Sequence, residues 1–266
     1  KPSSAASDVY KRQPQQGTIR GWLDQGAASY PEKVFLESVD QQRSATYADV
    51  SQFCRRLSQK LRKKGFGPND RVALLSNNAL EHLLIYFGVM YYGATICTIH
   101  VEMNAVIIKE ILKSLDPKLV LFEEGLGLEE EIRQSDYPAR ALGSWSQQDC
   151  TGFVAEVSGL PAENPAPVYG PNDIATIFFT SGTTAEPKGI LCSFQHLETN
   201  VAAVLEAFGI RAEDRLLDYR SFNWASAQML SALGALCQGA TLIMPRKSSS
   251  SRFFEWIKTY KPTVVA

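Results

Sequence analysis

Apolar and polar residues follow two distinct patterns along most of this chain. Short apolar runs alternate with longer segments in which apolar residues recur every three or four positions. The first pattern is typical of buried β-strands and the second of amphipathic helices. Because strands and helices alternate, we predict an α/β fold of packed βαβ units, with mainly parallel sheets and helices on both faces.

Several of these elements have clear start or stop signals. Thr46 and Asp49 form a capping-box pattern before one apolar stripe, and Gly65 follows its end. Segment 80–92 is apolar almost all round, which predicts a buried helix. The predicted helices span 46–64, 80–92, 104–115, 197–208, 224–237 and 252–260. The predicted strands span 71–76, 94–99, 118–122, 173–179, 216–219, 240–244 and 263–265.

Composition along the chain suggests two lobes. Residues 1–17 are rich in Ser, Pro and Gln, and we expect a disordered tail or a scar from cloning. A Pro-, Ala- and Gly-rich stretch, 159–171, is predicted to link a first α/β lobe, 18–158, to a second, 172–266. The second lobe looks incomplete at its C-terminus. Gly-Ala-Thr recurs at 93–95 and 239–241, each time between a predicted helix and a strand, which suggests related lobes.

Composition also limits the classes of partner. The 45% hydrophobic and 21% charged content is that of an ordinary globular protein, and the net charge of −1 gives no support to nucleic-acid binding. No apolar run is long enough for a membrane span. The five cysteines are scattered and form no metal-binding pair, which favours buried free thiols and a cytoplasmic setting.

Segment 180–190, Thr-Ser-Gly-Thr-Thr-Ala-Glu-Pro-Lys-Gly-Ile, follows a strongly apolar strand and carries the most specific chemistry. Hydroxyls and backbone N–H groups donate to phosphate oxygens, and a lysine adds positive charge. A plain turn does not require this set of residues. Gly182 and Lys188 have the spacing of a Walker loop, but Pro187 replaces its second Gly and Gly189 its Ser or Thr. We therefore reject the Walker interpretation.

The segment resembles the phosphate-binding signature of the adenylate-forming (AMP-dependent synthetase/ligase) superfamily, Thr-Ser-Gly-Thr-Thr-Gly-x-Pro-Lys-Gly. The one departure is Ala185, where Gly is usual. The family includes acyl-CoA synthetases, luciferases and peptide-synthetase adenylation domains. The resemblance covers roughly 18–266 and the front half of such an enzyme. The segments 218–228 and 239–260 look most similar to the crotonobetaine/carnitine–CoA ligase group.

This resemblance implies a reaction and its reagents. A small carboxylic acid would attack ATP to form an acyl-adenylate, with Mg²⁺ assisting, and CoA would then take the acyl group as a thioester. Two lobes would enclose the active site in the crevice between them. The resemblance assigns phosphate binding to Thr180, Ser181, Gly182, Thr183, Thr184 and Lys188. The family's magnesium motif and catalytic lysine lie downstream, so we expect no catalytic residue and no metal ligand in this fragment, and no turnover by it alone. A homodimer is possible.

A second region resembles the family's acyl-pocket element. It comprises Asp-Arg-Leu-Leu at 214–217 and Arg-Ser-Phe-Asn-Trp at 220–224. The family's aromatic or His position falls on Asn223, with Trp224 beside it. Trp224 lines an acyl pocket or faces a cation in one interpretation, and packs in the core in an equally weighted one.

Other features leave alternatives open. A non-catalytic nucleotide-binding scaffold of the same fold fits the departures at Ala185 and Asn223. A peptide-synthetase adenylation domain would need an Asp near the pocket, and Asp218 is weakly placed for that role. His82, His100 and His196 lack metal spacing, so we expect structural or surface histidines. The basic residues of segment 55–64 are best explained as the solvated face of a helix, with a CoA or membrane-surface patch as the alternative.

Overall fold

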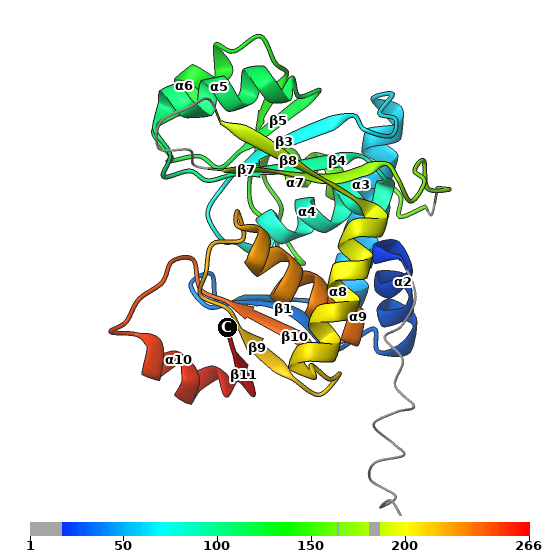
Figure 1. Ribbon diagram of the computed structural model, residues 1–266, viewed down its shortest axis with the longest axis vertical. Coiled ribbons are helices and arrows are strands. Elements are labelled where there is room, and N and C mark those ends of the chain that lie inside the picture. The colour runs from blue at the N-terminus through cyan, green and yellow to red at the C-terminus, as the bar shows by residue number, and fades with distance from the viewer. Residues whose placement is uncertain (1–17, 164, 181–186) are drawn as a thin grey trace, which may run out of the picture.

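The computed structural model describes residues 18–163, 165–180 and 187–266, with only the backbone described at Thr180. Two β-sheets lie one above the other, and helices fill the space between them and cover their outer faces (Figure 1). All neighbouring strands pair in parallel except β1–β2 and β7–β8. The predicted α/β fold with mainly parallel sheets is therefore confirmed.

The larger sheet has six strands in the order β6-β5-β3-β4-β7-β8. They are β3 (Arg71–Leu75), β4 (Thr95–Ile99), β5 (Leu119–Phe122), β6 (Ala139–Ala141), β7 (Ile174–Thr180) and β8 (Lys188–Ser193). The smaller sheet has five strands in the order β11-β9-β10-β1-β2. They are β1 (Val34–Ser38), β2 (Arg43–Thr46), β9 (Arg215–Leu217), β10 (Thr241–Met244) and β11 (Val264–Val265).

The strands do not divide between the sheets at the expected lobe boundary. β1 and β2 come from the expected first lobe but join β10, through pairs such as Leu36 with Leu242. β7 and β8 follow the expected linker 159–171 but join β4. The end of that linker is packed on the domain, because the Tyr169 ring stacks on Phe194 with centroids 3.9 Å apart. Local periodicity predicts strands, whereas their neighbours depend on contacts between distant segments.

The helices arrange the molecule in alternating layers (Figure 1). α5 and α6 cover the outer face of the larger sheet, and α10 covers that of the smaller sheet, where Trp256 packs on Leu217 and Ile243. The helices are α2 (Ile19–Ser29), α3 (Tyr47–Lys63), α4 (Leu80–Tyr92), α5 (Ala105–Leu115), α6 (Glu129–Arg133), α7 (Gly152–Ser158), α8 (Phe194–Phe208), the π-helix η1 (Ala227–Leu233), α9 (Gly234–Gln238) and α10 (Phe253–Tyr260).

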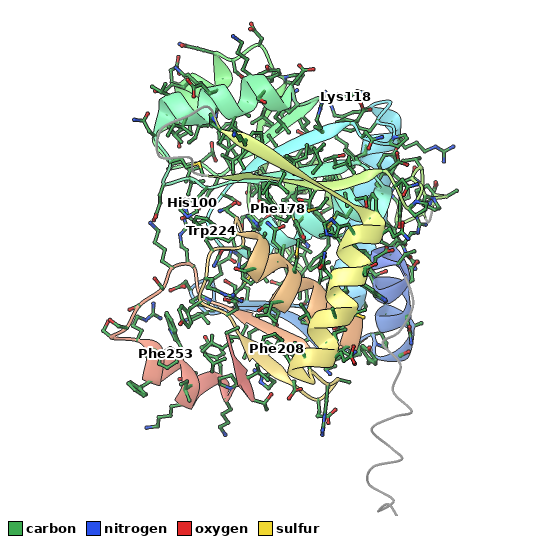
Figure 2. The ribbon with its side chains drawn as sticks, viewed as in Figure 1. His100, Lys118, Phe178, Phe208, Trp224 and Phe253 are labelled. Carbon is green, nitrogen blue, oxygen red and sulfur yellow. The ribbon has the colours of Figure 1, made fainter. Side chains whose placement is uncertain are left out.

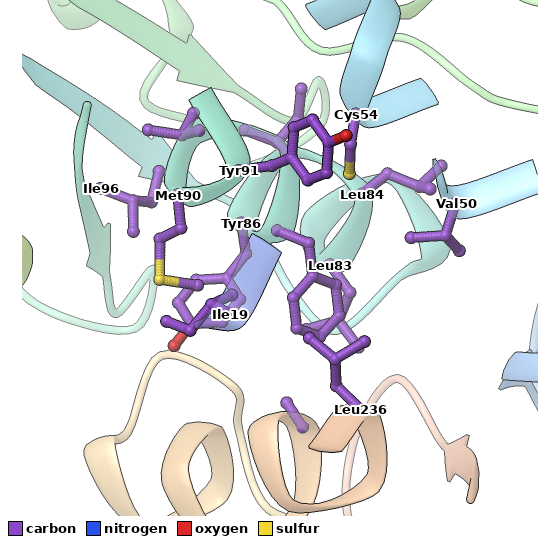
Figure 3. Close-up of a cluster of buried hydrophobic side chains, with 14 of the residues drawn as sticks. Ile19, Val50, Cys54, Leu83, Leu84, Tyr86, Met90, Tyr91, Ile96 and Leu236 are labelled. Carbon is purple, nitrogen blue, oxygen red and sulfur yellow. The ribbon is translucent and has the colours of Figure 1, made fainter. Parts of the chain in front are cut away.

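The largest core cluster lies between the sheets and is centred on α4. Every residue of α4 is buried, as its all-round apolar sequence predicts. Figure 3 shows Leu83, Tyr86 and Met90 of this helix among side chains from α2, α3, β4 and α9. α3 begins at Tyr47 with the predicted capping box in place at Thr46. This core holds the two sheets in a defined relative position.

Two glycine junctions confirm the repeated Gly-Ala-Thr pattern as a shared local structure. Gly93 ends α4 with φ 107°, and Gly239 ends α9 with φ 76°. A Cβ at Gly93 would lie 2.3 Å from the Tyr169 ring, and one at Gly239 would lie 1.8 Å from the Tyr30 hydroxyl. Both positions therefore exclude a side chain twice over, by backbone conformation and by space.

Several predicted elements differ from the structure. Segment 224–237 is not one α-helix but a π-helical turn followed by α9. The chain does not pass from the phosphate segment directly to a helix, because β8 intervenes and carries Lys188. α2, β1 and β2 were not predicted at all. None of the helices among the described residues is long and apolar enough to cross a bilayer.

Candidate functional site

The carboxyl ends of β3, β4, β9 and β10 converge on a cleft of about 540 Å³. Two of these strands belong to each sheet, so the cleft lies where the sheets meet. Loops after parallel strands collect at one edge, which is where open α/β sheets bind ligands. The residues that line the cleft follow these strands in turn: Asn77, Asn78, His100, Val101, Glu102, Tyr219, Arg220, Ser221, Asn223, Trp224, Ser226, Arg246, Lys247 and Ser248.

Trp224 and His100 form an aromatic corner of the cleft (Figure 2). Their rings meet edge to face, with centroids 5.4 Å apart. Trp224 is 46% exposed, so core packing does not account for it. Sequence reasoning missed His100 as a cleft residue. Its position directly after the predicted strand 94–99 was visible in the sequence, but a lone His after a strand does not by itself indicate a site residue.

Asn223, the residue at the predicted acyl-pocket position, lines the cleft with 9% of its surface exposed. Its Nδ2 donates to the Ser76 backbone oxygen at 3.0 Å and to Ser221 Oγ at 3.1 Å. Its Oδ1 is buried and has no hydrogen-bond partner in the described part of the chain. The contact with Ser76 fixes the amide orientation, because the flipped amide would set two acceptors against each other.

The backbone beneath Asn223 is held by two buried amide side chains. Asn78 Nδ2 donates to the backbone oxygens of Arg220 and Pro245, at 2.8 and 3.1 Å. Its Oδ1 accepts from Phe222 N at 2.8 Å. Gln228 Nε2 donates to Phe222 O at 2.5 Å. Asn78, at the end of β3 in the larger sheet, thus ties down loops that follow two strands of the smaller sheet.

We expect Asn78→Leu to lower the free energy of unfolding by about 2 kcal/mol, because it leaves buried backbone groups without partners. Urea denaturation measures this change. Asn200→Leu is the matched control, since the Asn200 amide bonds only to His196 O within α8. A loss for Asn78→Leu no greater than that for Asn200→Leu would contradict the clamping role.

Asp218 is fully buried behind the cleft and is bound on all sides. Its carboxylate accepts from Arg220 Nε at 3.0 Å, from Arg220 Nη2 at 2.6 Å and from Ser231 Oγ at 2.6 Å. This hydrogen-bonded pairing with Asp218 raises the pKa of the Arg220 guanidinium above its ordinary value. Asp218 is therefore not available to hold a substrate ammonium group.

The other charged residues around the cleft are also paired. Arg246 bonds to Glu123, which in turn accepts from Asn77 N at 2.8 Å. Lys247 lies 3.3 Å from Glu102 across the cleft mouth. These pairs join loops from the two sheets. They leave the described walls of the cleft without an uncompensated charge.

His82 lies under the cleft floor, with Nδ1 2.7 Å from Ser76 Oγ. Burial lowers its pKa from the ordinary value of 6.5 to about 4, although the Phe222 backbone and Glu123 oppose the shift. The unfolded chain therefore takes up a proton near pH 6.5 that the folded chain takes up only near pH 4. We expect stability to fall as pH drops through this window, with no further effect of His82 below it.

Urea denaturation across this pH range tests the assignment. His82→Gln should have a shallower pH dependence than the natural protein, whereas His196→Gln, on the exposed face of α8, should not. Equal slopes for all three proteins would show that another group is responsible.

The phosphate segment begins at the same edge of the larger sheet. β7 pairs in parallel with β4, with Thr176 opposite Ile96, so the end of β7 at Thr180 lies level with His100. β8 then returns antiparallel, with Lys188 opposite Thr180. Lys188 is exposed and has no ion-pair partner among the described residues. Ser181, Gly182, Thr183, Thr184 and Ala185 lie outside the described residues, as does the Thr180 side chain, so their phosphate-binding roles stay predictions.

Curated proteins similar to this chain include both CoA ligases and peptide synthetases. The chain is 24% identical to the sulfoacetate–CoA ligase of Cupriavidus necator, over 94% of this chain and 50% of that protein. It is 28% identical to the long-chain-fatty-acid–CoA ligase FadD13 of Mycobacterium tuberculosis, over 65% and 34% respectively. Nonribosomal peptide synthetase 32 of Fusarium pseudograminearum is 24% identical over 93% of this chain and 3% of its own length. The chain spans half or less of the length of these relatives.

Solved structures share the fold. The inhibitor-bound N-terminal domain of FACL13 from Mycobacterium tuberculosis superposes with a TM-score of 0.82 at 24% identity, over 93% of this chain and 62% of that one. VinN in complex with 3-methylaspartate gives a TM-score of 0.79 at 20% identity, over 94% and 65%. A family model described as AMP-binding enzyme matches residues 23–266. The chain therefore belongs to the AMP-binding enzyme family.

Proposed function

We propose that this chain is the N-terminal, adenylating portion of an ATP-dependent carboxylate–CoA ligase. The observation that carries this proposal is the position of the phosphate signature. Its first residue ends β7 beside the cleft, and its lysine returns on β8 at the same edge. Family membership and the similarity to CoA ligases support it.

In this proposal the cleft positions the acid and the 180–189 segment holds the triphosphate. The acid carboxylate attacks the α-phosphorus of ATP, an acyl–phosphate bond forms, and pyrophosphate leaves. Two anions must approach each other, so charge compensation and fixed geometry are the main tasks of the protein. Lys188 is suited to the leaving pyrophosphate because its ammonium is not engaged by a carboxylate among the described residues.

Mg²⁺ in such a reaction is bound by the substrate phosphates, by one or two carboxylates and by several waters. No group of three or more His, Cys, Asp or Glu side chains among the described residues is placed to hold a metal ion. We propose that Mg²⁺ binds together with ATP, through the phosphate oxygens of the nucleotide. The adenylate would then react with the CoA thiol, which displaces AMP. A cytoplasmic location, a homodimer and membership of the crotonobetaine/carnitine group are further parts of the proposal.

The test is acid-dependent ATP–pyrophosphate exchange by the full-length protein, followed by an assay for CoA thioester. Exchange together with thioester formation supports the ligase. Exchange without a CoA thioester would favour a peptide-synthetase type of acceptor, in line with the peptide-synthetase relatives. No exchange with any acid, despite measurable ATP binding, would support the non-catalytic scaffold.

A further inference from the structure

A second cavity, of about 390 Å³, lies between α3 and the loop 142–151 that leads from β6 to α7. It shares no described lining residue with the cleft. On α3 it is lined by positions 49, 52, 53 and 56, which lie on one face of the helix because they recur every three or four residues. The rest of its lining comes mainly from the loop. The cavity is therefore a separate candidate for a bound molecule.

Arg56 brings to this cavity a positive charge that the described part of the chain does not neutralise. It forms no ion pair and no hydrogen bond with any described residue. Arg55, beside it on α3, pairs with Asp24 at 3.1 Å. Lys60, one turn further on, pairs with Glu156 at 2.7 Å. The Nε atom of Arg56 is buried, but its Nη groups are not, so a molecule in the cavity can reach the Nη groups.

Trp145 supplies a second unused donor. It lines the cavity with 6% of its surface exposed. Its indole N–H makes no hydrogen bond with any described residue and, unlike those of Trp22 and Trp256, is not buried. Its backbone is fixed, because Trp145 N donates to Glu81 Oε1 at 2.6 Å and Trp145 O accepts from Arg43 Nη1. This wall of the cavity is thus held in place while its side-chain donor stays unused.

The other polar groups indicate which kind of molecule suits the cavity. Gln52 and Gln148 are exposed, and their side chains make no hydrogen bonds with described residues, so each can donate. Guanidinium, indole and amide N–H groups together suit carboxylate oxygens. Two turns from the guanidinium on the same helix face, the Asp49 carboxylate accepts from Thr46 and Gln147. Its negative charge would repel a phosphate dianion more strongly than a monoanion.

We propose that this cavity binds a small organic monocarboxylate. The carboxylate group accepts hydrogen bonds from Arg56 Nη and from the Trp145 indole, and the other polar groups of the molecule meet Gln52 and Gln148. The site does not depend on the proposed adenylation, because the two cavities have no described lining residue in common.

The test is an NMR titration of the full-length natural protein carrying ¹⁵N in its tryptophan indoles. Trp145→Phe identifies the signal of the cavity, and Trp224→Phe that of the cleft. Acetate and gluconate are added at constant ionic strength, with sodium chloride, glucose and inorganic phosphate as comparison solutes. We expect both carboxylates to shift the Trp145 signal to saturation, gluconate at the lower concentration. Chloride and glucose should leave the signal in place, and phosphate should bind more weakly than gluconate.

Arg56→Gln should raise the dissociation constant of gluconate, read at the Trp145 signal, by about 10- to 100-fold, because a charge-assisted hydrogen bond is lost. Arg62→Gln is the matched control, since Arg62 is exposed on the same helix and lines neither cavity. We expect it to keep the natural affinity. The titration of the natural protein needs no variant, so it stands even where Arg56→Gln folds poorly.

Three results would overturn this inference: no saturable shift of the Trp145 signal with either carboxylate, equal affinities in Arg56→Gln and Arg62→Gln, or tighter binding of phosphate than of gluconate. A shift confined to the Trp224 signal would place the carboxylate in the cleft, which also overturns the inference but leaves the proposed function standing. Absence of ATP–pyrophosphate exchange would overturn the proposed function and leave this site unaffected.

Discussion

Replacing Lys188 with methionine in the full-length protein should lower acid-dependent ATP–pyrophosphate exchange by about 10- to 100-fold, because one charge-assisted contact to phosphate contributes about 1.5–3 kcal/mol. Lys188 lies on β8 opposite Thr180, at the mouth of the phosphate segment. Its side chain is exposed, and no carboxylate among the described residues pairs with it. Methionine is an unbranched side chain only one atom shorter than lysine, and it lacks the charge and the N–H donors.

Lys63→Met is the matched control for this measurement. Lys63 is an exposed lysine at the C-terminal end of α3, which leads into the amino end of β3 and so lies at the sheet edge opposite the cleft. We expect its exchange rate to equal that of the natural protein. Melting temperatures of both variants should stay near the natural value, since both side chains are exposed. Unchanged exchange in Lys188→Met would remove the basis for the phosphate-binding assignment.

Asp218→Asn should lower the free energy of unfolding by about 3–5 kcal/mol, the cost of breaking a buried ion pair from one side. The carboxylate is fully buried and satisfies four donors, three of them on Arg220. The amide has one acceptor oxygen where the carboxylate has two, and it sets its NH₂ group against a donor. The Arg220 guanidinium, with 30% of its side chain exposed, would then lack a counter-charge.

Asp116→Asn provides the comparison on the surface. Asp116 pairs with Arg71 at 3.4 Å, and its side chain is 73% exposed. Such pairs contribute about 1 kcal/mol or less, because water screens them. Asn also tolerates the left-handed backbone at this position, where φ is 47°. Urea denaturation measures the free energy of unfolding of both variants. Equal losses of stability would show that the burial of Asp218 does not determine how much its ion pair stabilises the fold.

Helices with strong local signals were predicted close to their observed bounds. α4 matches segment 80–92 because a helix that is apolar on every face has no stable place except the core. α3 matches because the Thr46–Asp49 box and the run to Gly65 mark both ends chemically. β1 and β2 were missed because their burial is mixed and because β10, the strand that joins β1 to the rest of the sheet, is distant in sequence.

The candidate site was predicted only in part. The sequence named Asn223 and Trp224 through their motif, and both line the cleft, while their role as a substrate pocket stays a prediction. His100 and Asn78 were missed, since a lone His or Asn after a strand has no distinguishing pattern. Their importance appears only when the smaller sheet brings residue 224 next to His100 and the backbone at Phe222 next to Asn78.

The sequence by itself determined the local structure and the chemical signature of this protein. Side-chain periodicity, caps and turn residues act over a few neighbours, and the 180–189 motif is contiguous, so both are visible in one dimension. Only the tertiary structure decided which strands share a sheet and which side chains meet in the cleft. Those outcomes depend on hydrogen bonds and burial between segments far apart in the chain, such as β1 with β10 and β4 with β7. These contacts stabilise the fold only when the whole core is assembled.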